Sequence, residues 1–143
     1  MILLLALLAL PEPAQEKGES VSFSTVDKGT SSGFTVPLQM FVSSEKDWAD
    51  TWEKRLGASK RPRPSVDFAK EVVIVAALGM KDSGGYSIEV SKIVRTKDDV
   101  QVIVRIGSPP EGAKPGGGPT SPFVLVKIKK PDKPVTFKEE EKK

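Results

Sequence analysis

Apolar residues recur at alternate positions through much of the chain, the spacing expected of strands with one buried face. Tyr86, Ile88 and Val90 show it clearly, and the phase then shifts, which predicts a β-bulge near Ser91. Thr96–Asp99 is predicted to join this strand to the next as a hairpin. Alternation or extended apolar character predicts these strands: Val21–Thr25, Phe34–Val42, Tyr86–Val94, Val100–Ile106, Phe123–Lys129 and Val135–Phe137.

The run Val72–Leu78 differs from these strands because it is apolar at every position. Such a strand needs cover on both faces, so we predict that it lies at the centre of a sheet and ends at Gly79. Proline cannot donate a ladder hydrogen bond. Pro37 therefore places Phe34–Val42 at a sheet edge or marks a break in it.

One amphipathic helix is predicted over Glu45–Leu56. Ser44 can cap its N-terminus, with Asp47 three residues later in a variant of the capping box, and Gly57 can end it. An apolar stripe runs along the helix at four-residue spacing: Trp48, Trp52 and Leu56. We therefore expect the helix to pack its two indoles on a sheet.

About seven strands and one helix indicate an α+β, mainly β domain: a curved antiparallel sheet, a partial barrel or a sandwich, with the helix packed on one face. Asp27–Gly33 is rich in turn-forming residues, and Ala58–Ser65 has the alternating prolines and basic residues of an extended connector. Ser108–Pro122 is a long Pro/Gly loop, either mobile or shaped by a partner. Lys138–Lys143 is wholly charged, and we expect a disordered tail there.

The N-terminus, Met1–Leu10, is an almost unbroken apolar run. It has the length of the apolar region of a signal peptide and is too short to span a bilayer as a helix, although no basic residue precedes it. We therefore interpret residues 1–15 as signal-like, 16–20 as a spacer, 21–137 as one domain and 138–143 as the tail. The alternative is a buried N-terminal strand or helix. Export predicts a periplasmic, cell-envelope or secreted protein without stable membrane insertion after signal removal.

The 143 residues suffice for one hydrophobic core, and 38% hydrophobic with 29% charged residues is a globular composition. The chain has no histidine and no cysteine. It therefore lacks the side chain that titrates near neutral pH, the thiolate nucleophile and common metal ligands, and we expect no catalytic residue, metal or cofactor. A net charge of +3, with acids and bases interspersed, gives a weak field, so nucleic acid is not an expected partner.

Three groups of residues admit both a functional and a structural interpretation. Gly84 and Gly85 could form a backbone pocket for an anionic group, but a diglycine between strands favours a tight turn. Aromatic rings could form a platform for a glycan or peptide, but helical spacing of the indoles favours packing: Trp48, Trp52 and Tyr86. Carboxylates three residues apart could bind Ca²⁺ or Mg²⁺, but on a helix they favour a solvated face: Asp47, Asp50 and Glu53.

A serine paired with a lysine could act as a hydrolytic dyad, either Ser83 with Lys81 or Ser31 with Lys28. The lysine of such a dyad must be desolvated to act as a base near neutral pH. Both pairs lie in glycine-rich turns that we expect to be wet. The sequence therefore favours a structural role for them.

Short motifs occur in order along the body of the chain: Gly29–Gly33, Asp47 and Trp48 with Trp52, Val66–Phe68, Gly79–Tyr86, Pro109 with Pro110, and Thr120–Phe123. With these motifs the chain resembles, from Val21 to Phe137, the C-terminal domain of the PrcB-type protease-complex subunits, a family of exported bacterial proteins. The strongest motif is the turn Gly-Met-Lys-Asp-Ser-Gly-Gly-Tyr between two strands. The family commonly has threonine at the position of Ser83, and more varied residues at Gly116–Gly118.

The resemblance implies an extracytoplasmic, non-catalytic protein-interaction module that serves as an accessory or stabilising subunit of a secreted protease complex. Loops on a rigid sheet commonly carry recognition. Candidate partner-binding residues therefore come from two loops: Asp82, Ser83, Gly84, Gly85, Tyr86, Pro109, Pro110, Gly116, Gly117, Gly118 and Thr120. Two other functions stay open at this point, a cell-envelope glycan-binding domain and a Ser/Lys hydrolase.

Overall fold

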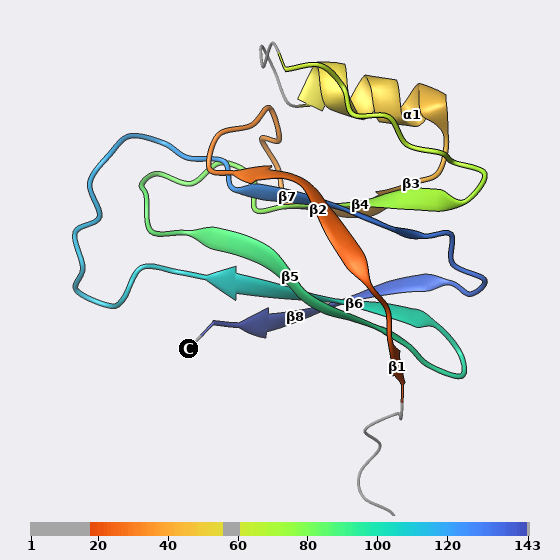
Figure 1. Ribbon diagram of the computed structural model, residues 1–143. Helices are drawn as coiled ribbons and strands as arrows, with labels where there is room; N and C mark the ends of the chain where they lie inside the picture. The colour runs from red at the N-terminus through yellow and green to blue at the C-terminus, as the bar shows by residue number, and fades with distance from the viewer. Residues whose placement is uncertain (1–17, 56–60, 143) are drawn as a thin grey trace, which may run out of the picture.

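The strand β4 (Glu71–Ala77) lies inside a four-stranded sheet, between β7 (Phe123–Lys129) and β3 (Leu38–Val42). β2 (Phe23–Gly29) completes this first sheet beyond β7. The computed structural model describes residues 18–55 and 61–142, and the strand pairs of this sheet are antiparallel. The predicted central strand is therefore confirmed, as is the edge position of the strand that follows Pro37 (Figure 1).

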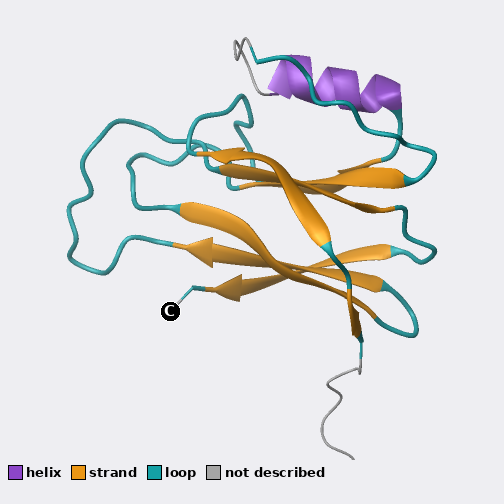
Figure 2. Cartoon of the chain, in the orientation of Figure 1, coloured by secondary structure: helices purple, strands orange, loops and turns teal. Residues whose placement is uncertain are grey.

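A second four-stranded sheet lies against the first, so the strands form a sandwich (Figures 1 and 2). The order of its strands is β1 (Glu19–Ser20), β5 (Ser87–Arg95), β6 (Val100–Gly107) and β8 (Val135–Glu141). β5 and β6 form the predicted hairpin, and their register shifts between Val90 and Lys92, which confirms the bulge near Ser91. β8 pairs with β6 in parallel, whereas we expected an antiparallel sheet.

The side chains of β4 enter two separate cores because successive residues of a strand point to opposite faces. Val72 and Ile74 lie between the sheets and pack against buried residues of β5, β6 and β7. Val73 and Val75 lie on the other face and pack against buried residues of the helix and β3. Both faces of β4 are shielded from water, as its uniformly apolar sequence requires.

A helical segment covers the outer face of the first sheet (Figure 2). It consists of α1 (Glu45–Asp50) followed by a π-helical turn, η1 (Thr51–Arg55). The hydroxyl of Ser44 accepts a hydrogen bond from the N–H of Asp47 at 3.2 Å, which confirms the predicted cap. The predicted end of the helix, Leu56–Gly57, lies outside the described residues.

The two tryptophans of the helix are packing residues, as their spacing predicts. Trp48 is fully buried, Trp52 is 6% exposed, and their ring centroids are 5.6 Å apart. Their indole N–H groups donate to backbone carbonyls of the following connector, at 2.9 Å to Pro64 and 3.2 Å to Arg61. The indoles therefore attach both the helix and part of the connector to the first sheet.

The strands β1 and β2 belong to different sheets although only Val21 and Ser22 separate them. β1 pairs with β5 and β2 pairs with β7, so this stretch of chain crosses between the sheets and closes one side of the sandwich (Figure 1). The opposite side is bounded by the edge strands β3 and β8. A side-chain hydrogen bond from Gln39 Nε2 to Glu139 Oε1, at 2.7 Å, connects these two edges. We call this the open side.

Asp27–Gly29 belongs to β2, so the prediction that a turn begins at Asp27 is wrong. An irregularity between Thr25 and Asp27 shifts the register against β7, and the side chain of Asp27 is buried. Its two carboxylate oxygens accept hydrogen bonds from Arg61, at 2.9 Å and 2.5 Å. A contact between distant segments therefore overrides the turn-forming character of the local sequence.

Lys138–Glu141 continues β8 alongside β6, so the prediction of a disordered tail is wrong for these residues. An ion pair between Glu140 and Arg105, at 2.9 Å, accompanies the parallel pairing. Glu19–Ser20, expected in the spacer, instead pairs with β5. The strands form a two-sheet sandwich with one helical segment, which confirms the α+β, mainly β class.

The predicted signal-like segment, residues 1–15, and the first two residues of the spacer lie outside the part of the chain that the structure describes. Within residues 18–55 and 61–142, no helix combines the length and apolar character needed to cross a membrane. Export therefore stays a prediction.

Replacing Trp48 with alanine should destabilise the fold by about 3–5 kcal/mol, because the smaller side chain leaves a cavity between the helix and the sheet. The free energy of unfolding from a urea titration measures this loss. Met80→Ala is the control: Met80 is 51% exposed, so its truncation should cost less than about 1 kcal/mol. Equal losses in the two variants would contradict the packing role of Trp48.

A candidate protein-binding site formed by two loops

Two loops meet at one end of the sandwich (Figure 1). Residues 78–86 run from β4 to β5, and residues 108–122 run from β6 to β7, so each loop passes from one sheet to the other. The N–H of Lys81 donates to the carbonyl of Thr120 at 2.7 Å, and the N–H of Thr120 donates to the carbonyl of Lys81 at 2.9 Å. We call these two bridged segments the loop pair.

Further hydrogen bonds join the two loops and attach their base to the first sheet. The hydroxyl of Thr120 donates to the carbonyl of Ser83 at 2.8 Å. At the base of the loops, the N–H of Leu78 donates to the carbonyl of Pro122 at 3.0 Å, in continuation of the β4–β7 pairing. The register of two central strands therefore determines which residues of the two loops face each other.

The diglycine of the first loop lies where the second loop approaches most closely. Gly85 has a φ of +89°, and a Cβ added there would lie 2.8 Å from Cγ of Pro109. A Cβ added to Gly84 would lie 3.2 Å from the carbonyl oxygen of Gly116. Gly85 therefore serves both the backbone turn and the contact between the loops, and a side chain there would separate them. This agrees with the tight turn that the sequence favours.

The side chains of Lys81 and Ser83 are engaged with groups other than each other. The ammonium of Lys81 lies 5.2 Å from the centroid of the Tyr86 ring, a cation–π distance. The hydroxyl of Ser83 donates to the carbonyl of Gly84 at 3.1 Å. These contacts favour a structural role for both residues over the hydrolytic dyad. The other candidate dyad, Lys28 with Ser31, is exposed at both positions.

The structure brings the candidate residues of the sequence analysis together in the loop pair. Those that hold the loops to each other or to the core are partly buried: Ser83, Gly84, Tyr86, Pro109 and Thr120. The remaining candidate residues are exposed, including Gly85 at the contact between the loops: Asp82, Gly85, Pro110, Gly116, Gly117 and Gly118. Only the fold brings the two sets side by side, because the Lys81–Thr120 bridge depends on the pairing of β4 with β7.

The other two candidate sites are not assembled. Trp48 and Trp52 are buried and cannot form a surface platform with Tyr86, so the alternative of an aromatic glycan-binding platform is wrong. Glu45 and Glu53 of the helix form ion pairs with Arg63, at 3.0 Å and 3.6 Å. Among the residues that the structure describes, no three acidic side chains gather into a set that could hold a metal ion.

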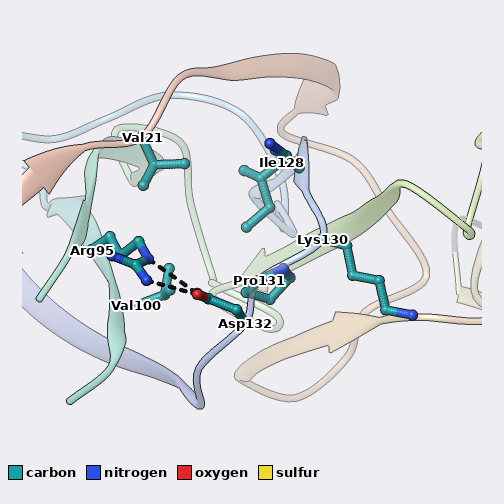
Figure 3. A pocket seen from close by; sticks show the side chains of 8 residues that line it. Val21, Arg95, Val100, Ile128, Lys130, Pro131 and Asp132 are labelled. Carbon is teal, nitrogen blue, oxygen red and sulfur yellow. Dashed lines mark hydrogen bonds and ion pairs between the residues drawn. The ribbon is translucent and has the colours of Figure 1, made fainter. Parts of the chain in front are cut away.

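A pocket of about 390 Å³ lies at the opposite end of the sandwich, next to the β5–β6 hairpin turn (Figure 3). Its lining includes Val21, Ile128 and Pro131, together with Arg95 and Asp132. The sequence analysis missed this pocket, because nothing local links an arginine in one hairpin to an aspartate far along the chain. Its distance from the loop pair follows from topology, since the two sites adjoin opposite ends of β5 and β6.

The guanidinium of Arg95 donates to both carboxylate oxygens of Asp132, at 3.0 Å and 2.7 Å. These hydrogen bonds favour the charged carboxylate and lower the pKa of Asp132 to about 2. The same partner raises the pKa of Arg95. In the adjoining turn, hydrogen bonds from the hydroxyls of Thr96 and Thr136 lower the pKa of Asp99. This end of the sandwich is therefore braced by charged groups.

The family model described as PrcB C-terminal matches residues 72–129. This range runs from β4 to β7 and contains both loops of the loop pair. The predicted resemblance to the C-terminal domain of PrcB-type subunits is confirmed over this range. No curated protein and no solved structure matches the chain.

Gly85→Ala should disrupt the loop pair more than Gly117→Ala does. Both glycines have positive φ, but an added Cβ at Gly117 meets nothing within 4 Å, whereas at Gly85 it meets Pro109. Backbone strain should cost about 1–2 kcal/mol in either variant, and the clash should add about 1–2 kcal/mol for Gly85→Ala. Urea unfolding measures the cost, and amide exchange at Lys81 and Thr120 should accelerate only in Gly85→Ala. Equal exchange in both variants would contradict the close contact.

The Arg95–Asp132 pair should stabilise the fold in a pH-dependent way. The pKa of Asp132 is lowered from 3.8 to about 2, so its contribution is present above about pH 4 and lost as the pH falls through about 2. Asp132→Asn should therefore unfold at a lower temperature than wild type at neutral pH, and the difference should vanish near pH 2. In Arg95→Gln, an NMR titration should place the Asp132 pKa closer to 3.8. A pH-independent difference would contradict the assignment.

Proposed function

We propose that this chain is a non-catalytic module that binds another polypeptide through the loop pair. The observation that carries the proposal is the meeting of two glycine- and proline-rich loops, bridged by backbone hydrogen bonds, at one end of a packed sandwich. Loops that a rigid scaffold positions in this way commonly carry recognition.

The outer surface of the loop pair suits contact with a polypeptide. Gly116–Gly118 is exposed, and a Cβ added at these glycines would meet nothing within 4 Å, so a partner can approach the backbone closely. Pro110 is exposed in the same loop and has a rigid ring, which loses little conformational entropy when it is covered. The backbone of this surface is therefore accessible to a partner.

The polar side chains of the loop pair support binding over catalysis. The hydroxyls of Ser83 and Thr120 donate to backbone carbonyls, and the ammonium of Lys81 lies over an aromatic ring. These groups shape the loops and are not arranged as a nucleophile beside a base. The sequence contains neither histidine nor cysteine, the residues that most often fill those roles.

The match to the PrcB C-terminal family supports a partner within a protease complex. We place the chain there as an accessory or stabilising subunit. The apolar run Met1–Leu10 supports export, and with it a location in the periplasm, in the cell envelope or outside the cell.

Site-specific photocrosslinking in cells that produce the full chain tests this function. A photoreactive residue at Asp82, on the exposed surface of the loop pair, should capture a protease subunit, which mass spectrometry of the product identifies. The same residue at Asp98, which is exposed in the hairpin turn at the opposite end of the sandwich, is the matched control. Capture from Asp98 alone, or from neither position, would overturn the proposal.

Charge reversal at the same positions gives a quantitative test. Asp82→Arg should reduce recovery of the protease with the tagged chain by at least about fivefold, because it places a new charge within the contact. Asp98→Arg should leave recovery unchanged. The unfolding midpoints of both variants should match that of wild type, because both side chains are exposed.

A further inference from the structure

Four strands lie at the edges of the two described sheets, and three of them carry charged residues. β1 contains Glu19, β2 contains Asp27 and Lys28 beside its irregularity, and β8 is mostly charged. Charges and bulges on edge strands prevent unwanted pairing with other chains. β3, with the sequence Leu-Gln-Met-Phe-Val, has no such protection.

The exposed large apolar residues of the described chain also gather along β3. They are Val36, Phe41 and Met80, at 56%, 45% and 51% exposure. Phe41 lies within β3, and Val36 lies just before it. The N–H of Met80 donates to the carbonyl of Thr35 at 3.2 Å, so Met80 lies beside the start of this strand. An unpaired backbone edge and uncovered apolar side chains therefore coincide.

The open side adds a groove and negative charge beside this edge. A groove of about 460 Å³ runs between β3 and the second sheet, and its lining includes Gln39, Ile106 and Glu139. Lys81 also lines the groove, with its ammonium over the ring of Tyr86. Glu139 and Glu141 lie on the same face of β8, because side chains two apart in a strand share a face. A segment laid along β3 would thus have apolar contacts from the groove and carboxylates near one flank.

We infer that β3 accepts an additional strand from the partner: an extended segment that alternates apolar residues and carries a lysine or arginine toward Glu139. Strand addition at an exposed sheet edge gives affinity through backbone hydrogen bonds and selectivity through alternate side chains. The inference rests on the proposed function, because the groove is continuous with the loop pair at Lys81, which belongs to both. One partner could therefore contact the loop pair and pair with β3.

A second copy of the chain fits this edge less well. If the β3 strands of two copies paired antiparallel, they would be related by a two-fold axis perpendicular to the joined first sheets. The second sheets of the two copies would then lie on the same side of this joined sheet. The β8 strands would then approach each other with Glu139 and Glu141 of each copy, and like charges repel. A partner segment with basic residues has the complementary charge.

Alternate residues of β3 direct their backbone N–H and C=O groups away from β4, and a substitution at one of these residues affects only the outer edge. The N–H of Leu78 donates to the carbonyl of Pro122, on the side of β7. The backbone groups of successive residues point to opposite edges of a strand, so those of Ala77 and Val75 point toward β3. Their partners Leu38 and Met40 bond to β4. The backbone groups of Phe41 therefore point outward, and Phe41→Lys adds a charge to this edge without disturbing the ladder.

A peptide-display library tests the edge with the folded chain. The library consists of ten-residue peptides in which apolar residues occupy alternate positions and the positions between them are randomised. Selected binders should be rich in lysine and arginine at the randomised positions. For the best labelled peptide, Phe41→Lys and N-methylation of alternate peptide amides should each weaken binding by at least about tenfold, measured by fluorescence anisotropy. Thr25→Lys, on the charged edge strand β2, is the matched control and should bind as wild type does.

Three outcomes would overturn the inference: no binding peptide, equal binding by Phe41→Lys and wild type, or a homodimer in light scattering that Phe41→Lys dissociates. The last outcome assigns the edge to a second copy. Suppose that Asp82→Arg no longer recovers the protease, whereas Phe41→Lys recovers it and binds the peptides as well as wild type does. The strand inference then fails and the proposed function stands. If peptides bind at β3 but no protease is captured, the proposed function fails and the edge remains a binding site.

Discussion

The fold depends on the burial of both faces of β4. A strand that is apolar at every position cannot leave either face in water, so it needs a second sheet on one side and the helix on the other. This requirement also fixes its neighbours, because β3 and β7 must satisfy its backbone on both edges. The register of β4 with β7 then places Lys81 opposite Thr120, so the geometry of the loop pair follows from the packing of the core.

Most of the regular elements could be predicted from local patterns. The cap at Ser44, the buried indoles, the bulge near Ser91 and the central strand each have a signal within a few residues. Elements that depend on distant partners could not be predicted. Asp27–Gly29 reads as a turn but is held in β2 with Arg61 nearby, and the charged end of β8 becomes a strand only because β6 offers a parallel edge.

The candidate site shows the same division. The turn-forming glycines and prolines marked both loops in the sequence, yet their contact through Gly85 and Pro109 is a tertiary event with no local signal. The pocket near Arg95 was missed for the same reason, since Asp132 belongs to a different connection. Sequence patterns thus locate loops well, whereas the distances between loops follow from strand register.

The two ends of the sandwich are stabilised in different ways, and the difference bears on function. Near the hairpin turn, charged side chains such as Arg95, Asp132 and Asp99 are committed to partners within the chain. At the loop pair, backbone hydrogen bonds and glycine contacts supply the order instead. Because backbone groups make these contacts, the order of the loops does not depend on exposed side chains such as Asp82. Replacement of these side chains can therefore change the specificity of the surface without loss of the fold. Changes at this exposed surface and the stability of the fold are therefore separable in this domain, which is the property expected of a module that binds a partner.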